Sequence, residues 1–424
     1  MNNLDAPDAS DRMTCVAQRR MNTTVLSQTS GETALPKSSG NHSKLTPPRG
    51  YALEDMAARR AWLEEKIGRP LPEFKLDSPE DFQGLLENQV GYLGLPLSVA
   101  GPLKIEGTYA RGEFQVPLCT VEGTLSLSMT RGLYLAHLSG GFKSQHLRQE
   151  LSRSPIFIFD EIEDAAAFAT WIDRQFAPIK AAAETSTRHG KLLRIEKQIV
   201  HNRVILNLVY STGEAAGQNM VTVATEHACN HIAATARDLK LKRWLIESNY
   251  CGDKNAATGT MMRGRGHHVI CSALIEARFL RKLFRTTPEA MLASCVDKHL
   301  GSQLGGVLGM NMHNANALAA IYIATGQDAA CVAENCVGIT TYEARGNDLY
   351  CTLTMPSITV GTVGGATRLH QQRANLDMLG CSGPDSSKKL AEIICAASLG
   401  LELSLGGAIV SHEFATAHAQ FGRR

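Results

Sequence analysis

Residues 203–220 read RVILNLVYSTGEAAGQNM, and this stretch decides how the middle of the chain is built. The apolar run 203–210 predicts a buried strand, the small residues 211–217 predict a turn, and 219–239 predicts a helix. Backbone N–H groups at such a turn and helix start can face a phosphate-bearing ligand. The pattern is not GxGxxG, and glycines suit any tight turn, so a purely structural turn remains the alternative interpretation.

The stretches around this junction complete a regular order of strands and helices. We expect strands at 156–159 and 192–199 and a helix at 164–176, followed by the strand 203–210 and the helix 219–239. This β-α-β-β-α order is typical of a ferredoxin-like α/β unit inserted into a larger domain.

The rest of the chain predicts an α+β protein. The small-residue stretch 123–141 predicts a central helix, and Ala391 to Gln420 predicts a last helix. We therefore expect a large mixed α/β domain, the inserted small α/β domain, and a C-terminal helical flap. The expected boundaries are 1–50 for a disordered leader without aromatic residues, 51–74 for an N-terminal helical segment, 75–154 with 246–400 for the large domain, 155–245 for the small domain, and 401–424 for the flap.

The composition excludes several classes of function. The 424 residues include 43 Lys and Arg against 41 Asp and Glu, a formal net charge of +2, so no nucleic-acid partner is expected. The apolar stretches fall short of the roughly 18–20 residues of a membrane span, and the N-terminus lacks a secretory pattern. The 11 cysteines form no CxxC pair, and no HExxH motif is present, which argues against metal sites. We therefore expect a soluble cytoplasmic protein with reduced thiols, without a metal and without a membrane partner.

Certain ionisable residues have small or apolar neighbours in the sequence, which marks them as candidate catalytic groups: Glu122, Lys254, Asp328 and His418. Burial raises the pKa of a carboxyl group and lowers that of a lysine, and a lysine that stays charged beside carboxylates can polarise a carbonyl group. This combination suits carbonyl reduction. Each residue alone could instead be an exposed or structurally paired charge. His412 and His418 would lie on different faces of one helix, and periodicity does not choose between them.

Several longer motifs follow one another along the chain. They are Glu87-Asn88-Gln89-Val90-Gly91-Tyr92, Val99-Ala100-Gly101-Pro102-Leu103, Val116-Pro117 to Glu122-Gly123, Asn249 to Lys254, Ile323 to Asp328, Met355-Pro356-Ser357-Ile358 through Gly364-Gly365, and Glu402 to His418. In this order they resemble the catalytic part of the 3-hydroxy-3-methylglutaryl-CoA (HMG-CoA) reductase family, in the form found in eukaryotes and archaea. The resemblance covers about residues 75–424.

The resemblance implies an NADPH-dependent reduction of HMG-CoA to mevalonate and CoA through a thiohemiacetal and an aldehyde, with two NADPH per turnover. It implies that Glu122 supplies or relays a proton, Lys254 stabilises the oxyanion, Asp328 tunes that lysine, and His418 protonates the leaving thiolate. It also implies that the large substrate domain binds the CoA thioester, that the inserted ferredoxin-like domain is the dinucleotide-binding unit, and that the protein is a homodimer or tetramer with shared active sites. The implied cofactor-binding residues are Thr187, Arg188, Glu214, Gly217, Asn219, Gly364 and Gly365. The implied substrate-binding residues are Glu87, Asn88, Ser128, Arg131, Arg153, Asp253, Lys298, Asn316 and Leu405.

The chain departs from the family pattern beside the candidate lysine. Glu247 stands where the family usually has Ser, and Asn255 where it has a second Lys, at positions that normally help bind the substrate carboxylate. These changes add an anion and remove a cation. One alternative is therefore the same chemistry on a different acyl-CoA or carrier thioester. A non-catalytic scaffold is a more distant alternative, which loss of a catalytic residue would have favoured, and none of those residues is lost.

Overall fold

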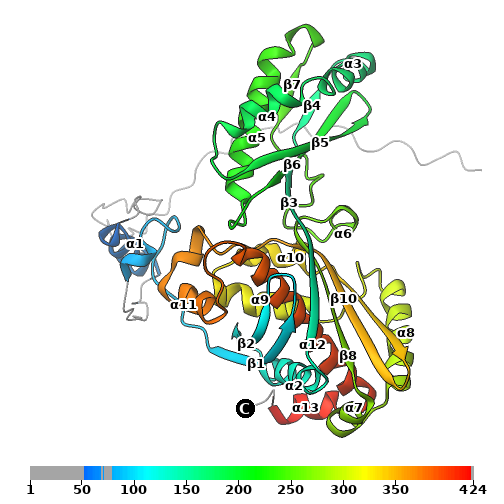
Figure 1. Ribbon diagram of the computed structural model, residues 1–424. Coiled ribbons are helices and arrows are strands. Elements are labelled where there is room, and N and C mark those ends of the chain that lie inside the picture. Colours follow the sequence, from blue (N-terminus) through cyan, green and yellow to red (C-terminus); the bar gives the residue numbers. More distant parts are fainter. Residues whose placement is uncertain (1–51, 68–69, 71–78, 422–424) are drawn as a thin grey trace, which may run out of the picture. The chain divides into compact units, whose positions relative to one another are not determined.

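The computed structural model describes residues 52–67, 70 and 79–421 (Figure 1). Helix α1, Leu53–Ile67, confirms the helix expected in this segment. It contacts the next segment through Arg59, a fully buried side chain whose Nε donates to the Gln89 carbonyl at 2.8 Å. The leader expected at 1–50 lies outside the described residues.

One long strand belongs to both parts of the fold. The sheet order is β7-β4-β6-β3-β8-β10-β9, with β1 beside β3, β2 beside β1 and β5 beside β6. Strand β3, Phe142–Arg153, pairs antiparallel with β8 from Lys143 to Glu150 and with β6 through its last three residues. The other strands are β1 Leu97–Glu106, β2 Arg111–Cys119, β4 Ile156–Ile158, β5 Lys191–Val200, β6 Arg203–Ser211, β7 Arg243–Leu245, β8 Gly266–Ile275, β9 Ile339–Arg345 and β10 Asp348–Ile358.

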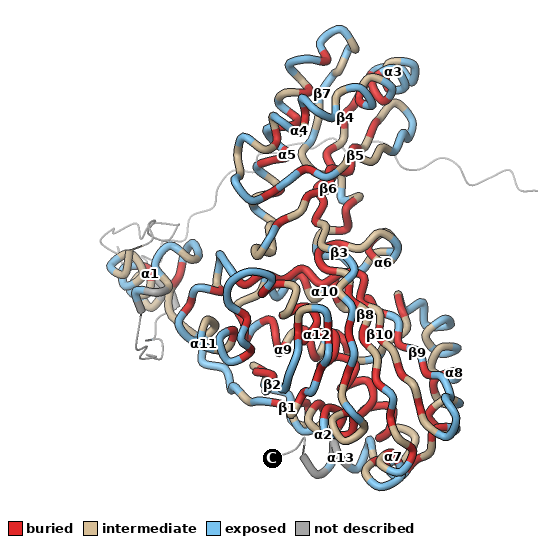
Figure 2. Tube along the Cα trace, in the orientation of Figure 1, coloured by how far each residue is buried: buried red, intermediate tan, exposed pale blue. Residues whose placement is uncertain are grey.

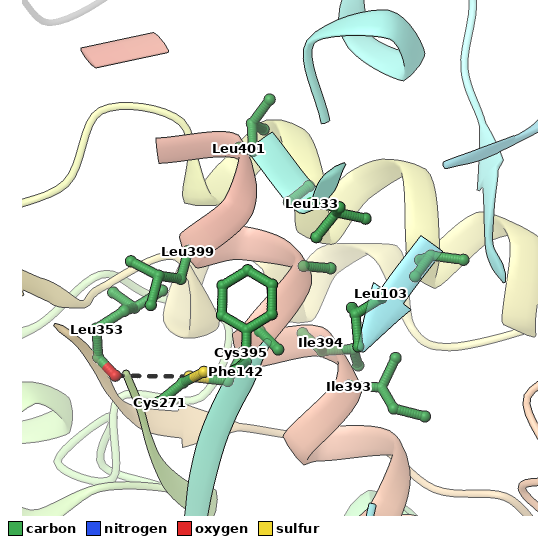
Figure 3. Packing of buried hydrophobic residues seen from close by; sticks show 14 of the residues in the cluster. Leu103, Leu133, Phe142, Cys271, Leu353, Ile393, Ile394, Cys395, Leu399 and Leu401 are labelled. Carbon is green, nitrogen blue, oxygen red and sulfur yellow. Dashed lines mark hydrogen bonds between the residues drawn. The ribbon is translucent and has the colours of Figure 1, made fainter. Parts of the chain in front are cut away.

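Helix α12, Ser386–Val410, lies at the centre of the larger hydrophobic core, with almost every residue from Ser386 to Ala408 buried (Figure 2). Figure 3 shows its Cys395, whose Sγ donates to the Leu353 carbonyl of β10 at 3.6 Å, among leucine and isoleucine side chains. This helix is apolar and long enough to cross a membrane, with a mean hydropathy of 1.9, so the expectation that no segment reaches that length is wrong. The window is 89% buried inside the fold, which accounts for its composition.

The central helix predicted at 123–141 is confirmed as α2, Leu125–Leu138. It packs against α12 at close range: a Cβ on Gly132 would stand 1.8 Å from the Gly400 carbonyl oxygen. Because only a glycine permits this approach, Gly132 determines how tightly the two helices pack.

A second hydrophobic core consists of residues between Leu151 and Ala236. Its strands confirm the predicted ones. The helix predicted at 164–176 is confirmed over its first part as α3, Ile162–Ile172, but its predicted end is wrong, because a separate helix, α4, spans Phe176–Glu184. Lys197 donates to the Ala169 carbonyl at 2.7 Å in the last turn of α3, which satisfies a terminal acceptor and favours the helix end there. Helix α5, Gln218–Thr235, and β7 complete this part.

The predicted last helix, Ala391 to Gln420, is also wrong. Helix α12 ends at Val410 because the backbone N–H groups of His412 and Glu413 turn back to the last carbonyls of the helix, with His412 at φ 59. Helix α13, Phe414–Phe421, follows, so His412 and His418 do not share one helix. A division at 401 would fall inside α12. The remaining helices are α6 Thr258–Arg263, α7 Ala277–Phe284, α8 Pro288–Leu304, α9 Asn314–Thr325, α10 Val332–Asn335 and α11 His370–Met378.

Candidate active site

Lys254 and Asp328 form an ion pair beyond the end of α9. The Lys254 Nζ lies 3.0 Å from Asp328 Oδ2, and the two side chains are 47% and 39% exposed. The expectation that burial would tune these groups is therefore wrong. The hydrogen bond to Asp328 raises the pKa of Lys254, against a smaller opposing effect of burial. The lysine consequently stays an ammonium group that can stabilise a negative charge but is a weak proton donor.

The loop that carries Lys254 rests on a buried ion pair. Arg265 Nη1 donates to both carboxylate oxygens of Glu334, at 2.7 and 2.8 Å, and neither side chain is exposed. Glu334 also accepts a hydrogen bond from the Lys254 backbone N–H at 2.9 Å and from the Thr359 hydroxyl at 2.6 Å. Lys254 has φ 57, a conformation that costs a non-glycine residue free energy. The buried pair therefore holds the lysine backbone in a conformation it would otherwise avoid.

Arg153, at the end of β3, is the centre of the neighbouring charged cluster. Its Nη1 lies 2.9 Å from Glu247 Oε2 and 2.9 Å from Asp253 Oδ2. Gln218 connects Asp253 to Arg265, because its Nε2 donates to Asp253 at 3.2 Å and its Oε1 accepts from Arg265 at 2.6 Å. Arg153 was expected to meet the substrate, but here its Nη1 is already paired with two carboxylates of the protein.

Glu122 lies in the loop between β2 and α2, at a separate cavity of about 280 Å³. Its carboxylate is exposed and accepts a hydrogen bond from Asn316 Nδ2 at 3.4 Å. The same cavity is lined by the predicted Ser128, Arg131 and Leu405, together with residues of α13. Arg131 is fixed in the wall, because its Nη2 donates to the Ser404 carbonyl at 2.7 Å.

The candidate residues thus fall into two groups at opposite ends of α9. Asn316, which contacts Glu122, lies in the first turn of the helix, whereas Asp328, which contacts Lys254, follows its last residue, Thr325. A helix of 12 residues spans about 18 Å at a rise of ~1.5 Å per residue. None of the contacts among the described residues joins the carboxylate of Glu122 to Lys254.

Lys298 lies apart from both groups, on α8 beside Tyr342 and the buried Glu402. Burial lowers the pKa of Lys298, while the charge of Glu402 opposes that shift. Glu402 Oε1 accepts the backbone N–H groups of Met312 and His313 at 2.9 and 2.5 Å, just before α9 begins. This acidic residue, which the sequence did not single out, connects the lysine to the start of the helix that carries Asn316.

The two glycine-containing loops considered for a nucleotide lie side by side. Ala215 forms a parallel bridge with Val363, and the Thr362 N–H donates to the Glu214 carbonyl at 2.8 Å. Gly217 has φ 86, and a Cβ there would stand 2.3 Å from Thr212, so the turn requires glycine. At Gly364 and Gly365, by contrast, a Cβ would meet open space.

Glu214 has a structural role in this region. Its carboxylate accepts the backbone N–H groups of Asp385 and Ser387, each at 2.7 Å, at the N-terminus of α12. A carboxylate at that end of a helix is favourable because it faces unpaired N–H groups and the positive end of the helix dipole. Glu214 therefore anchors the turn and does not present a carboxylate to a ligand.

Thr187 and Arg188 lie in the turn between α4 and β5, near the start of α5. The Thr187 hydroxyl accepts the Gly190 N–H at 3.0 Å, and Gly190 packs against Met220, the residue after Asn219. Arg188 and Asn219 are both exposed. Within the described part of the chain, Arg188 has no hydrogen bond or ion pair, so its charge is available to a ligand.

Two predicted site residues lie outside these groups, Glu87 and Asn88, which are exposed in the segment before β1. His418 belongs to α13, whose Phe414 and Thr416 line the cavity beside Glu122. No group of His, Cys, Asp and Glu suited to a metal ion occurs among residues 52–67, 70 and 79–421.

The sequence did not single out Arg265 and Glu334, although they support the candidate lysine. Charged residues are normally exposed, and these two are 69 positions apart. The available signal was the setting of Arg265 between Gly264 and Gly266, which indicates tight packing around it.

Comparison with known proteins gives consistent matches in sequence and in fold. The family model described as "Hydroxymethylglutaryl-coenzyme A reductase" matches residues 55–423. A 3-hydroxy-3-methylglutaryl-coenzyme A reductase of Aeropyrum pernix is 40% identical over 92% of this chain and 94% of its own. That of Methanocaldococcus jannaschii is 37% identical over 86% and 92%. A solved class II reductase of Streptococcus pneumoniae, bound to NADPH, has a TM-score of 0.65 at 20% identity, covering 82% of this chain and 92% of its own. The likeness confirms the α+β fold.

Proposed function

The chain belongs to the hydroxymethylglutaryl-coenzyme A reductase family, and from that premise we propose that it reduces HMG-CoA to mevalonate and CoA with NADPH. One structural observation carries the proposal: the ion pair between Lys254 and Asp328, held by a buried support beneath the lysine backbone. Reduction of a thioester builds negative charge on the carbonyl oxygen, and a fixed ammonium group stabilises that charge.

Each chain residue then has a defined task. Lys254 binds the carbonyl oxygen, and Asp328 keeps the lysine protonated through a pKa raised by their hydrogen bond. Because Lys254 is a weak acid, Glu122 supplies or relays the proton to the oxygen. His418 protonates the CoA thiolate when the thiohemiacetal breaks its C–S bond to give the aldehyde.

The residues around α5 fit a dinucleotide. The N-terminus of α5 offers unpaired N–H groups to a phosphate, Arg188 offers an unpaired exposed cation, and Gly364 and Gly365 leave open space beside the turn. Thr187, Gly217 and Asn219 would shape this site, with Glu214 anchoring it. When bound, NADPH would supply hydride to the carbonyl carbon, two equivalents per turnover.

The separation along α9 supports a homodimer or tetramer with shared active sites. One chain holds Glu122 and Lys254 at opposite ends of that helix, so a second protomer would complete the set. Large apolar side chains are available for such contacts, among them Leu93, 78% exposed, and Leu304, 92% exposed. We place the enzyme in the cytoplasm, where the ten free cysteines of the described residues would stay reduced.

The test is oxidation of NADPH by the purified protein with HMG-CoA, with mevalonate identified as the product. We expect turnover in the wild type and its loss in Lys254→Ala and His418→Ala. Lys240→Ala is the matched control, because Lys240 pairs with Asp164 in a part of the fold remote from this chemistry. Turnover that survives Lys254→Ala would contradict the assigned mechanism. Sedimentation velocity on the same preparation tests the oligomer, and an active monomer would refute the shared site.

A further inference from the structure

The guanidinium of Arg153 has more carboxylates beside it than are needed to neutralise its positive charge. Its guanidinium faces Glu247 and Asp253, both 2.9 Å from the same nitrogen, Nη1. Asp253 alone would balance the charge of Arg153, because Arg265, which also lies 3.2 Å from Asp253, is already paired with Glu334 at 2.7 Å. The second carboxylate, Glu247, is therefore not needed to neutralise a buried cation.

Glu247 is held in place by its own backbone. Its Oε1 accepts the N–H groups of Ser248 and Asn249 at 2.9 and 2.7 Å, which leaves Oε2 directed at Arg153. The Glu247 side chain is 27% exposed, whereas that of Arg153 is only 10% exposed. An incoming ligand therefore meets Glu247 at the open side of a buried guanidinium.

Arg153 also retains unused hydrogen-bonding capacity. Its Nε is buried without a hydrogen-bond partner among the described residues, although guanidinium groups favour carboxylates that bind through two nitrogens. The guanidinium of Arg153 is therefore suited to bind the carboxylate of a ligand, and Glu247 occupies part of the place where that carboxylate would bind. Asp253, the other carboxylate beside Arg153, directly precedes Lys254 in the chain, so the ligand's carboxylate would belong to the acyl group being reduced.

The surrounding charges oppose a second carboxylate. The connected cluster contains the cations Arg153, Lys254 and Arg265 and the anions Glu247, Asp253, Asp328 and Glu334. The anions outnumber the cations, and Asn255 next to Lys254 adds no positive charge. A carboxylate on the substrate would have to compete with Glu247 for the same guanidinium.

We infer that Glu247 is a specificity-determining residue that occupies the carboxylate-binding side of Arg153 and thereby lowers the affinity for HMG-CoA relative to acyl thioesters whose distal end is uncharged. This inference rests on the proposed reductase function and specifies its acyl selectivity. Glu247 weakens the discrimination between HMG-CoA and thioesters that lack the distal carboxylate. The effect lies in binding, because Glu247 contacts neither the ammonium group of Lys254 nor Asp328 in the described structure.

The experiment compares HMG-CoA with 3-hydroxy-3-methylbutyryl-CoA, which lacks only the distal carboxylate, in the wild type and in Glu247→Ser and Glu247→Gln. A hydrogen bond to a charged group changes an equilibrium by about tenfold to a hundredfold. We therefore expect Glu247→Ser to lower the KM for HMG-CoA about tenfold, with kcat within about threefold and the KM for the neutral thioester unchanged. Glu247→Gln, which can keep the backbone hydrogen bonds, should change KM in the same direction if Glu247→Ser folds poorly.

A matched control is Glu150→Gln, which removes another glutamate that contacts an arginine, Arg194, at 2.8 and 2.9 Å. This variant should leave the ratio of kcat/KM for the two thioesters unchanged. Calorimetric binding of each thioester without NADPH should show the same selectivity as KM. If the wild type turns over a thioester but neither Glu247 variant changes the ratio, the inference is overturned and the reductase function stands. If no protein turns over either thioester, both fall together.

Discussion

Replacing Glu334 by Ala should destabilise the fold and slow the reaction, because both depend on the buried contacts of its carboxylate. The substitution leaves the fully buried Arg265 without its carboxylate partner at 2.7 Å. Removal of one member of a buried ion pair typically costs about 3–5 kcal/mol of the free energy of unfolding. At ~2 °C per kcal/mol for a protein of this size class, the midpoint of thermal unfolding should fall by roughly 6–10 °C.

Activity should change separately from stability. Glu334 accepts the backbone N–H of Lys254, which has φ 57, so the variant should also lose kcat at temperatures far below its unfolding midpoint. Calorimetric or circular-dichroism melts measure the first effect, and initial rates of NADPH oxidation at 25 °C measure the second.

The controls isolate the buried pair. Glu343→Ala removes a glutamate that contacts Arg345 on the surface, where both side chains are about half exposed, and should change the free energy by less than ~1 kcal/mol. A cycle of Glu334→Ala, Arg265→Ala and the double variant should show a coupling energy of about 2 kcal/mol or more. A loss under ~1 kcal/mol in Glu334→Ala, or strictly additive losses, would refute the assigned role of the pair.

Two further predictions concern the ion pair and the helix packing. In Asp328→Asn the pKa of Lys254 should fall, since the hydrogen bond to Asp328 raises it. The ammonium group is then lost at lower pH, so the decline of kcat on the alkaline side should begin at a lower pH than in the wild type. An unchanged alkaline side of the pH profile would contradict this prediction. Gly132→Ala places a Cβ 1.8 Å from the Gly400 carbonyl oxygen and should cost about 1–3 kcal/mol of stability in denaturant titrations, compared with a negligible change in the open-space control Gly301→Ala.

The sequence predicted the elements better than their ends. Apolar patterns were sufficient for α2, β5, β6 and the start of α5, because their buried faces repeat with the period of a strand or helix. The end of α12 was missed. Glycines such as Gly406 and Gly407 are natural signals for a helix end, but here they allow close packing, since a Cβ on Gly407 would stand 2.2 Å from Phe284. A glycine required by a tertiary contact is indistinguishable in sequence from one that ends a helix.

The sequence predicted which residues belong to the candidate site but not how they contact one another. Motifs named Lys254 and Asp328, and the structure joins them at 3.0 Å. The expected tuning by burial failed, because how far a side chain is exposed depends on elements distant in the sequence. Similarly, no pattern near Glu214 indicates that its carboxylate binds the N-terminus of α12, more than 170 residues later.

The departures from the family pattern converge on one cluster, which affects how roles can be transferred from relatives. Gln218 donates to Asp253 and accepts from Arg265. Hydrogen bonds to charged groups contribute about 1.5–3 kcal/mol each, so Gln218 stabilises the loop before Lys254. Glu247 adds a carboxylate to the same loop through Arg153. The proposed role of Lys254 rests on its ion pair with Asp328, whereas a substrate that binds Arg153 would have to compete with the two carboxylates already beside that guanidinium.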